Sequence, residues 1–155
     1  MKHILIAALC GLSCAAHAAN DADTVAAALA CDQGAAPMSQ VVQALRSLGA
    51  TESAKGRFAL PEGKGIALFG GVANSVTIFR RKGGDEKYMA DSIGAFFKGP
   101  VVQPSASDGA DKAKPDANGF ITVQMPDGWI LVKRAAGGNL TAKAGNGGSF
   151  YTCSR

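Results

Sequence analysis

The sequence is poor in the residue types that most catalytic and metal sites use. Among its 155 residues are only two histidines, His3 and His17, and four cysteines. Both histidines, with Cys10 and Cys14, fall within residues 1–18, which have the pattern of a removable signal. The rest of the chain therefore lacks histidine, which excludes histidine-activated serine or cysteine nucleophiles, HExxH zinc sites and an imidazole pH switch. We expect no cofactor and no metal.

The signal pattern has three parts. Met1, Lys2 and His3 form a short positive start, residues 4–16 are apolar or small, and Ala16-His17-Ala18 is typical of a signal peptidase site. Cleavage is expected before Ala19. The apolar run is shorter than the roughly 20 residues that a membrane span needs, and no later run replaces it. We expect a mature domain over residues 19–155, periplasmic or secreted, without a transmembrane segment.

A lipoprotein anchored through Cys14 is the alternative for this segment. A bacterial lipobox has Leu at the third position before the cysteine, whereas here Leu12 stands at the second. The ordinary signal is therefore preferred over lipidation.

Export makes Cys31 and Cys153 a predicted disulfide, because two cysteines in an oxidising compartment near the ends of one domain pair readily. A redox or metal-binding pair is the alternative. The sequence has no CxxC spacing to lower a thiol pKa and no further soft ligand beside either cysteine. We expect a structural bond that stabilises the domain by about 4–5 kcal/mol in the loop-entropy model.

The charge balance indicates no nucleic-acid partner. The formal net charge is +4, Lys2 leaves with the signal, and no aromatic residues are interleaved with a basic run. Arg80, Arg81 and Lys82 form the densest basic cluster beside Gly83-Gly84, a pattern typical of a solvated hairpin end. Trp129, the single tryptophan, fits core packing or a recognition surface. These four residues are the candidate contact surface.

Two helices are predicted near the N-terminus. The alanine-rich residues 20–32 follow acidic positions and favour a short helix ending near Gly34, with Cys31 in its last turn. The second helix covers 39–48, between Pro37 and Gly49. Its apolar face consists of Val41, Val42, Leu45 and Leu48.

Strands are predicted from residue 57 onward. The first two segments are 57–60 and 66–69, and Gly70-Gly71 interrupts the pattern after the second. A third segment, 75–80, leads through a hairpin into 87–92. Residues 87–97 are ambiguous, because Met89, Ile93, Phe96 and Phe97 also have helical spacing. We predict a strand followed by irregular chain there. Residues 103–119 contain no large apolar side chain and are expected to form a mobile loop.

The C-terminal third has the pattern of a meander. Apolar segments at 120–125, 129–134, 140–144 and 149–153 are separated by glycine-rich turns. A bond from Cys153 to Cys31 would hold the first helix against this sheet. The predicted fold is therefore α+β, an antiparallel sheet with two N-terminal helices packed on one face.

Carboxylates are the residue type that could still catalyse a reaction. Glu52, Glu62, Asp91 and Asp127 are the candidates for glycoside hydrolysis, but nothing in the pattern brings two of them to a catalytic separation. No Ser-x-x-Lys motif occurs, and the glycines at 63, 65, 70 and 71 fit no phosphate-binding motif. Binding is therefore preferred over catalysis.

The function we expect is that of a small exported binding protein. It would recognise another protein or an envelope polymer, in the manner of an inhibitor or immunity-type protein, and act as a monomer. A histidine-free hydrolase that cleaves peptidoglycan through carboxylates is one alternative. A structural or antigenic surface protein without a defined ligand is another.

Overall fold

A computed structural model describes residues 11–53, 56–79, 92–99, 120–124, 128, 130–134 and 138–155. These stretches contain two helices, α1 (Gly11–Leu29) and α2 (Met38–Ser47), and then strands. The strands are β1 (Thr51–Glu52), β2 (Arg57–Ala59), β3 (Ile66–Leu68), β4 (Gly71–Ala73), β5 (Ser75–Phe79), β6 (Ser92–Lys98), β7 (Phe120–Gln124), β8 (Ile130–Arg134), β9 (Asn139–Gly145) and β10 (Gly148–Ser154).

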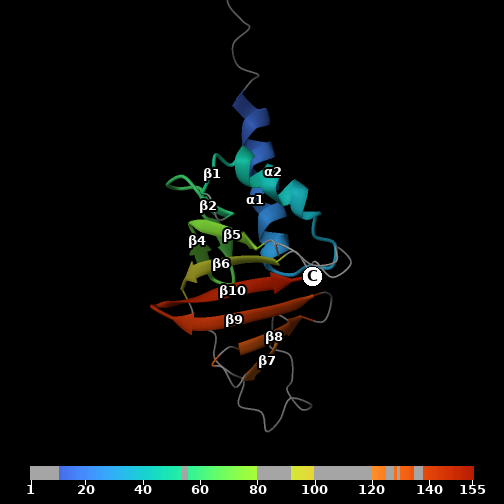
Figure 1. Ribbon diagram of the computed structural model, residues 1–155. Helices are drawn as coiled ribbons and strands as arrows, with labels where there is room; N and C mark the ends of the chain where they lie inside the picture. The colour runs from blue at the N-terminus through green and yellow to red at the C-terminus, as the bar shows by residue number, and fades with distance from the viewer. Residues whose placement is uncertain are drawn as a thin grey trace, which may run out of the picture.

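The described strands form one antiparallel sheet. Its main path runs β1-β2-β5-β6-β10-β9-β8-β7, while β3 and β4 form a hairpin that joins the sheet through β4 and β6. Strands β7 to β10 pair in chain order, so the predicted meander is confirmed. Strand β10 lies between β6 and β9 and connects the two halves of the sheet (Figure 1).

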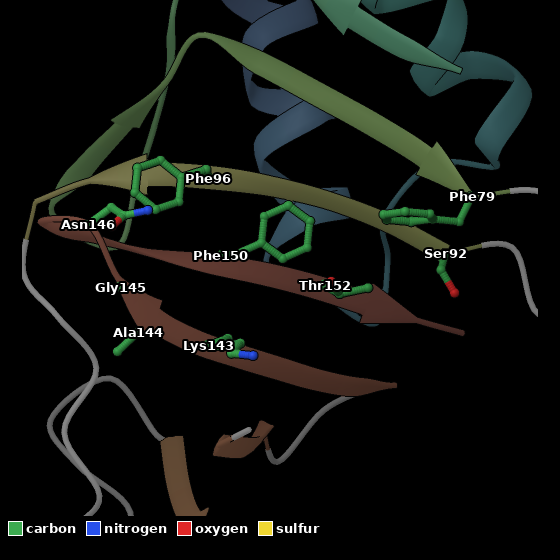
Figure 2. A pocket seen from close by; sticks show the side chains of 9 residues that line it. All are labelled: Phe79, Ser92, Phe96, Lys143, Ala144, Gly145, Asn146, Phe150 and Thr152. Carbon is green, nitrogen blue, oxygen red and sulfur yellow. The ribbon is translucent and has the colours of Figure 1, made fainter. Parts of the chain in front are cut away.

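Both helices lie on one side of the sheet. Helix α2 packs against α1, and α1 contacts β3, β6 and β10. Figure 1 shows α1 running down to β6 and β10, whereas β7, β8 and β9 extend away from the helices. Figure 2 views the opposite side, with the helices behind the sheet. The predicted α+β architecture, an antiparallel sheet with helices on one face, is therefore confirmed.

The hydrophobic core lies between the helices and the inner face of the sheet. Both helices and the central strands contribute fully buried side chains to this core. Among these are Val25, Leu29, Val41, Leu45, Phe58, Ile93 and Leu140. Burying apolar area of this kind is the main favourable term in folding, at about 25 cal/mol for each Å².

Helix α2 confirms the second predicted helix. It spans Met38–Ser47, and the four residues of the predicted apolar face are all buried. The helix ends in a Schellman motif, in which Ala50 N donates to Leu45 O and Gly49 N donates to Arg46 O. Gly49 has φ of 83°, a left-handed conformation in which glycine lacks the steric penalty of other residues.

Helix α1 differs from the prediction at both ends. It begins at Gly11 and ends at Leu29, so Cys31 lies after the helix and not in its last turn. The chain closes there in a second Schellman motif, with Asp32 N bonded to Ala27 O and Cys31 N to Ala28 O. Cys31 itself holds the left-handed position, with φ of 60°, where a side chain costs about 1–2 kcal/mol. The helix stops because this turn satisfies its last carbonyls.

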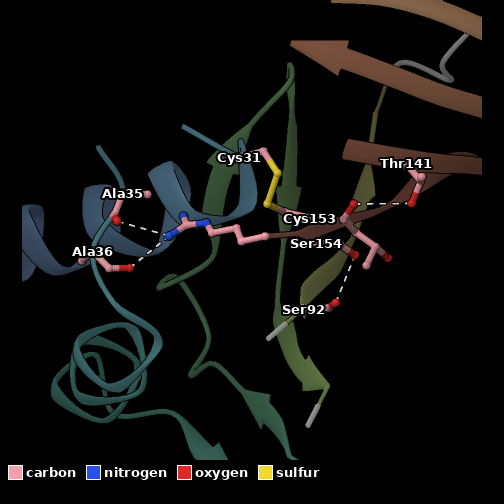
Figure 3. Close-up of a disulfide and its surroundings, with 9 residues drawn as sticks. Cys31, Ala35, Ala36, Ser92, Thr141, Cys153 and Ser154 are labelled. Atoms are coloured by element: carbon pink, nitrogen blue, oxygen red, sulfur yellow. Dashed lines mark hydrogen bonds between the residues drawn. A yellow bond between two sulfur atoms is a disulfide. The ribbon is translucent and has the colours of Figure 1, made fainter. Parts of the chain in front are cut away.

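The predicted disulfide is present between Cys31 and Cys153, with a Cα–Cα distance of 5.4 Å and a sequence separation of 122 (Figure 3). Both cysteines are buried, and Cys153 lies in the central strand β10. Nearby, Arg155 Nη1 donates to the carbonyl oxygens of Ala35 and Ala36 at 3.1 and 3.2 Å. The end of α1 is thus joined covalently to the sheet. A disulfide is consistent with an oxidising compartment.

The region around β6 differs from the prediction. Residues 92–98 form a strand, whereas the sequence predicts a strand over 87–92 and irregular chain afterwards. The helical spacing of Ile93, Phe96 and Phe97 is coincidental, because Ile93 and Phe97 point into the core while Phe96 points to the other face. Met89, the loop predicted over 103–119 and residues 1–10 lie outside the described residues. Residues 11–18 form the beginning of α1, so the signal and its cleavage stay predictions.

The β3–β4 hairpin is a second difference, because the sequence suggests only an interruption at Gly70-Gly71. Phe69 and Gly70 form a two-residue turn in which both have positive φ, 54° and 74°. The Phe69 ring stacks on Tyr151 at 4.4 Å and meets Phe97 edge-on at 5.9 Å. These contacts, each worth about 0.5–1.5 kcal/mol, offset the cost of a bulky residue in a left-handed turn.

Candidate binding groove

The strand register divides the central residues into two faces. On β6, Ile93, Ala95 and Phe97 are buried toward the helices, so Ser92, Gly94, Phe96 and Lys98 belong to the opposite face. We call this opposite side the outer face. It continues onto β10 and β9, because Phe96 pairs with Phe150 and Phe150 pairs with Lys143.

The outer face contains a groove with a volume of about 740 Å³. The described residues that line it come from β5, β6, β9, β10 and the β9–β10 turn (Figure 2). They are Phe79, Ser92, Phe96, Lys143, Ala144, Gly145, Asn146, Phe150 and Thr152. This volume lies within the range of about 300–1,000 Å³ that is usual for ligand pockets.

Three phenyl rings give the groove its apolar character. Phe96 and Phe150 are direct cross-strand partners on β6 and β10, and Phe79 ends β5 beside Ser92. Figure 2 shows the rings of Phe96 and Phe150 nearly face-on and the ring of Phe79 edge-on at the other end. Phe79 is 42% exposed, and the other large hydrophobic residue exposed in the described chain, Val72, pairs with Lys98 of the same face.

Two glycines allow these rings to lie low on the sheet. A Cβ built on Gly94 would come within 3.1 Å of Phe150 Cζ and within 2.9 Å of Tyr151 O. A Cβ on Gly148 would come within 2.9 Å of Phe96 Cζ. Each ring therefore covers a glycine of the neighbouring strand, a packing that fills the space left by the missing side chain. This reciprocal packing of rings over glycines shapes the groove.

Polar groups surround the rings. Ser92 Oγ and Ser154 Oγ share a hydrogen bond of 3.0 Å at the Phe79 end, and Thr141 Oγ1 donates to Thr152 O at 3.4 Å. Asn146 lies at the other end, in the tight turn between β9 and β10, with φ of 52°. The groove therefore has an apolar centre with polar groups at its edge, an arrangement that also occurs in protein interfaces.

The charges of the described residues are distributed unevenly. Lys98 and Lys143 lie on the outer face. Arg57 lies there too, because it pairs with Thr77, which in turn pairs with the outward-facing Gly94. The described acidic residues lie on α1, on its C-terminal turn, on β1 and in the β2–β3 loop; they are Asp21, Asp23, Asp32, Glu52 and Glu62. Every outer-facing charged side chain that the structure describes on a strand is therefore a cation.

The residues proposed from the sequence as a contact surface lie outside the described stretches. In the sequence, Arg80, Arg81 and Lys82 follow Phe79 directly, and Trp129 directly precedes β8. Their own positions are not described, and the proposal that they contact a partner stays a prediction.

The candidate carboxylates are not brought together in the described structure. Glu52 bonds Arg46 Nη2 of α2 at 3.0 Å, and Glu62 is exposed in the β2–β3 loop. Asp91 and Asp127 lie outside the described residues. Neither described carboxylate lines the groove. Among the residues described, no group of three or more His, Cys, Asp or Glu side chains is placed to hold a metal ion.

Sequence reasoning missed the residues that form the groove. The sequence shows that Phe79, Phe96 and Phe150 are apolar, but only the strand register shows that they share a face. The signal that could have identified them is alternation, because Phe96 is adjacent to the buried Phe97 and Phe150 is adjacent to the buried Tyr151. On a strand, neighbours of this kind must point to opposite faces.

No protein-family model, curated protein or solved structure matches this chain. None of the helices described is long and apolar enough to cross a membrane.

Proposed function

We propose that this protein is an exported binding protein that recognises another protein through the groove on its outer face. The observation that carries the proposal is the gathering of Phe79, Phe96 and Phe150 from three neighbouring strands on the face opposite the described helices. Apolar side chains gathered in a concave surface with a few polar groups beside them are typical of binding sites. The signal pattern and the disulfide support export.

The composition of the groove supports binding over catalysis. The described lining residues include one cation, Lys143, hydroxyl and amide groups, and three phenyl rings, but no carboxylate, histidine or cysteine. Hydrolysis of a glycan needs two carboxylates that flank the scissile bond. An aromatic centre, by contrast, is where the strongest contributions to protein binding concentrate.

Site-specific photo-crosslinking tests the proposal in the envelope of cells that make the full chain. A photoreactive residue replaces Thr152 at the groove, and a second variant carries it at Gln43, which is exposed on α2. We expect the Thr152 variant alone to yield a protein adduct of defined mass. Phe79→Ser should abolish it, and because Phe79 is 42% exposed this substitution leaves the core intact. Mass spectrometry then identifies the protein for binding measurements with purified components.

Three results would contradict the proposal. Adducts of equal yield at Thr152 and Gln43 would mean that the groove is no preferred site. The absence of any protein adduct at Thr152 would remove the protein partner. Clearing of a cell-wall suspension by the purified protein, stopped by changing Glu62, Asp91 or Asp127, would favour the peptidoglycan hydrolase instead.

A further inference from the structure

The tight turn between β9 and β10 consists of an asparagine followed by a glycine. We propose that Asn146 is a site of spontaneous deamidation, in which the main-chain nitrogen of Gly147 attacks the side-chain amide of Asn146. The product is aspartate or isoaspartate at the edge of the groove, which Asn146 lines. This modification goes beyond the proposed function and requires no partner.

The fold itself favours an Asn-Gly pair at this turn. Gly145 pairs in register with Gly148, so Asn146 and Gly147 form a two-residue hairpin turn. Both residues have positive φ, 52° and 73°. A turn of this kind matches the twist of the flanking strands, and asparagine and glycine are the residues that best tolerate its left-handed conformation. The pair that closes the hairpin is therefore also a pair that can react.

The reaction needs only the chain and water. Gly147 N loses its proton to base and attacks Asn146 Cγ, so that a bond between N and Cγ forms while the bond from Cγ to Nδ2 breaks. Nδ2 takes up a proton and leaves as ammonia. Water then opens the cyclic imide at either carbonyl, which gives aspartate or isoaspartate. Glycine has no side chain to hinder the approach of its nitrogen to Cγ.

The surroundings of the turn leave room for this reaction. Asn146 is exposed, and a Cβ built on Gly145 or Gly147 would meet nothing within 4 Å. Gly99 N donates to Gly147 O at 3.4 Å. That bond holds the peptide group after Gly147, whereas the attacking nitrogen belongs to the peptide group before it. The main chain at Asn146 can therefore rotate until Gly147 N faces Cγ, and water can reach the imide.

Exposure alone does not select Asn146, because the other asparagines that the structure describes are exposed as well. They are Asn20, Asn74 and Asn139, and the residues that follow them are Asp21, Ser75 and the fully buried Leu140. Each of these following residues carries a side chain beside the nitrogen that would attack. Asn20 is also held within helix α1. These three asparagines serve as internal controls.

Deamidation would change the groove, because Asn146 lies at the same end as Phe96 (Figure 2). Aspartate places a negative charge there. Isoaspartate in addition lengthens the main chain of the turn by a methylene group, which should disturb the pairing of Gly145 with Gly148 and displace the Phe150 ring. The protein would then have a fresh and an aged form that differ at the groove.

Incubation of the oxidised full-length protein in mildly acidic and mildly alkaline buffer, followed by peptide mapping with mass spectrometry, tests the proposal. We expect conversion of amide to acid at Asn146 to be at least about tenfold faster than at Asn20, Asn74 or Asn139. The rate should rise with pH, because Gly147 N must lose its proton. Asn118, which also precedes a glycine, lies outside the described residues, and its product is mapped separately.

Freshly prepared Asn146→Asp is the matched variant, because Asp-Gly fits the same turn and carries the new charge without the longer main chain. NMR shifts of the Phe150 ring should move further in the isoaspartyl form, separated by chromatography, than in this variant. Equal shifts would overturn the expected change in the groove.

Two results would overturn the modification site itself. One is an Asn146 that stays intact in the folded protein while the urea-unfolded chain converts, since the turn would then protect this residue. The other is conversion of Asn146 at the same rate as the three control asparagines. Neither result depends on the adduct formed at Thr152, so the deamidation site and the proposed function stand or fall separately.

Discussion

The inner and outer faces of the central sheet use the same strands and similar residues for different ends. On β6 and β10, the inward residues Phe97 and Tyr151 are buried and meet edge-on at 5.7 Å. The outward residues Phe96 and Phe150, their immediate neighbours, are half-buried and cover glycines. Aromatic rings therefore occur on both faces. The two faces differ in what lies against them: the helices and the disulfide lie on the inner side, whereas the outer side carries the groove.

The two faces of the sheet divide stability from the proposed binding. Inner-face residues are held by partners within the chain, so their loss should lower the free energy of unfolding. On the outer face Phe79 is 42% exposed and Phe96 and Phe150 are half-buried, so we expect their loss to alter the proposed binding more than stability.

Removing the disulfide should have the largest effect. The variant Cys31→Ser with Cys153→Ser should lose about 4–5 kcal/mol of unfolding free energy, because the unfolded chain gains the freedom of the open loop. Urea unfolding followed by circular dichroism measures the change. Thr152→Ser, adjacent on the outer face, serves as the control and should stay within about 0.5 kcal/mol. A loss below about 1 kcal/mol in the cysteine variant would show that the bond does not hold the inner layer.

Leu140 and Thr141 on β9 test the two faces within one strand. Leu140 is fully buried, so Leu140→Ala should cost about 2–5 kcal/mol through lost contacts and a cavity. Thr141 points outward and is half-buried, so Thr141→Ala should cost about 1 kcal/mol or less. Thermal unfolding of both variants gives the difference. Equal losses would mean that the outer face is as tightly packed as the inner one.

Gly94 tests how the groove is built. The Cβ of Gly94→Ala would crowd Tyr151 O and Phe150 Cζ, so we expect a loss of about 1–3 kcal/mol and a displaced Phe150 ring. NMR shifts of the Phe150 ring report the displacement, and urea unfolding reports the stability. Gly34→Ala is the matched control, since a Cβ there meets nothing within 4 Å. An unmoved Phe150 ring in the Gly94 variant would contradict the packing of ring over glycine.

Removing the ion pair on the helical side should have the smallest effect. Glu52→Gln removes the charge that pairs with Arg46, and both side chains are exposed, so the expected loss is about 0.2–1 kcal/mol. Unfolding at low and high salt measures it, and added salt should reduce the difference between variant and parent. A loss above about 2 kcal/mol would mean that this pair anchors β1 to α2 more firmly than its exposure indicates.

The fold was predictable where local patterns agree with the global arrangement. Helix α2 combines helical periodicity with Pro37 and Gly49 at its ends, and the last four strands are separated by glycine-rich turns. The disulfide followed from the number of cysteines and the expected compartment. For α2 and the last four strands, one physical cause, either amphipathic spacing or a turn residue, operates over a few neighbouring positions.

The features that were not predicted depend on contacts that no local pattern contains. The left-handed turn at Phe69 looks unfavourable in isolation and is stabilised by Tyr151, which lies far along the chain. Cys31 likewise takes a position typical of glycine, so the end of α1 was placed too late. The groove was not predictable at all, because Phe79, Phe96 and Phe150 meet only through the order of strands β5, β6 and β10.

The central place of β10 has a consequence for the order of events during biosynthesis. Of the strands described, β10 is made after all the others, yet it joins β6 to β9 and carries the cysteine that bonds the first helix. Until it emerges, the two halves of the sheet have no strand between them, and neither the groove nor the disulfide can form. Such long-range pairing is slow to form and exposes unpaired strand edges meanwhile. The proposed binding through the groove would therefore begin only once β10 has been added to the sheet.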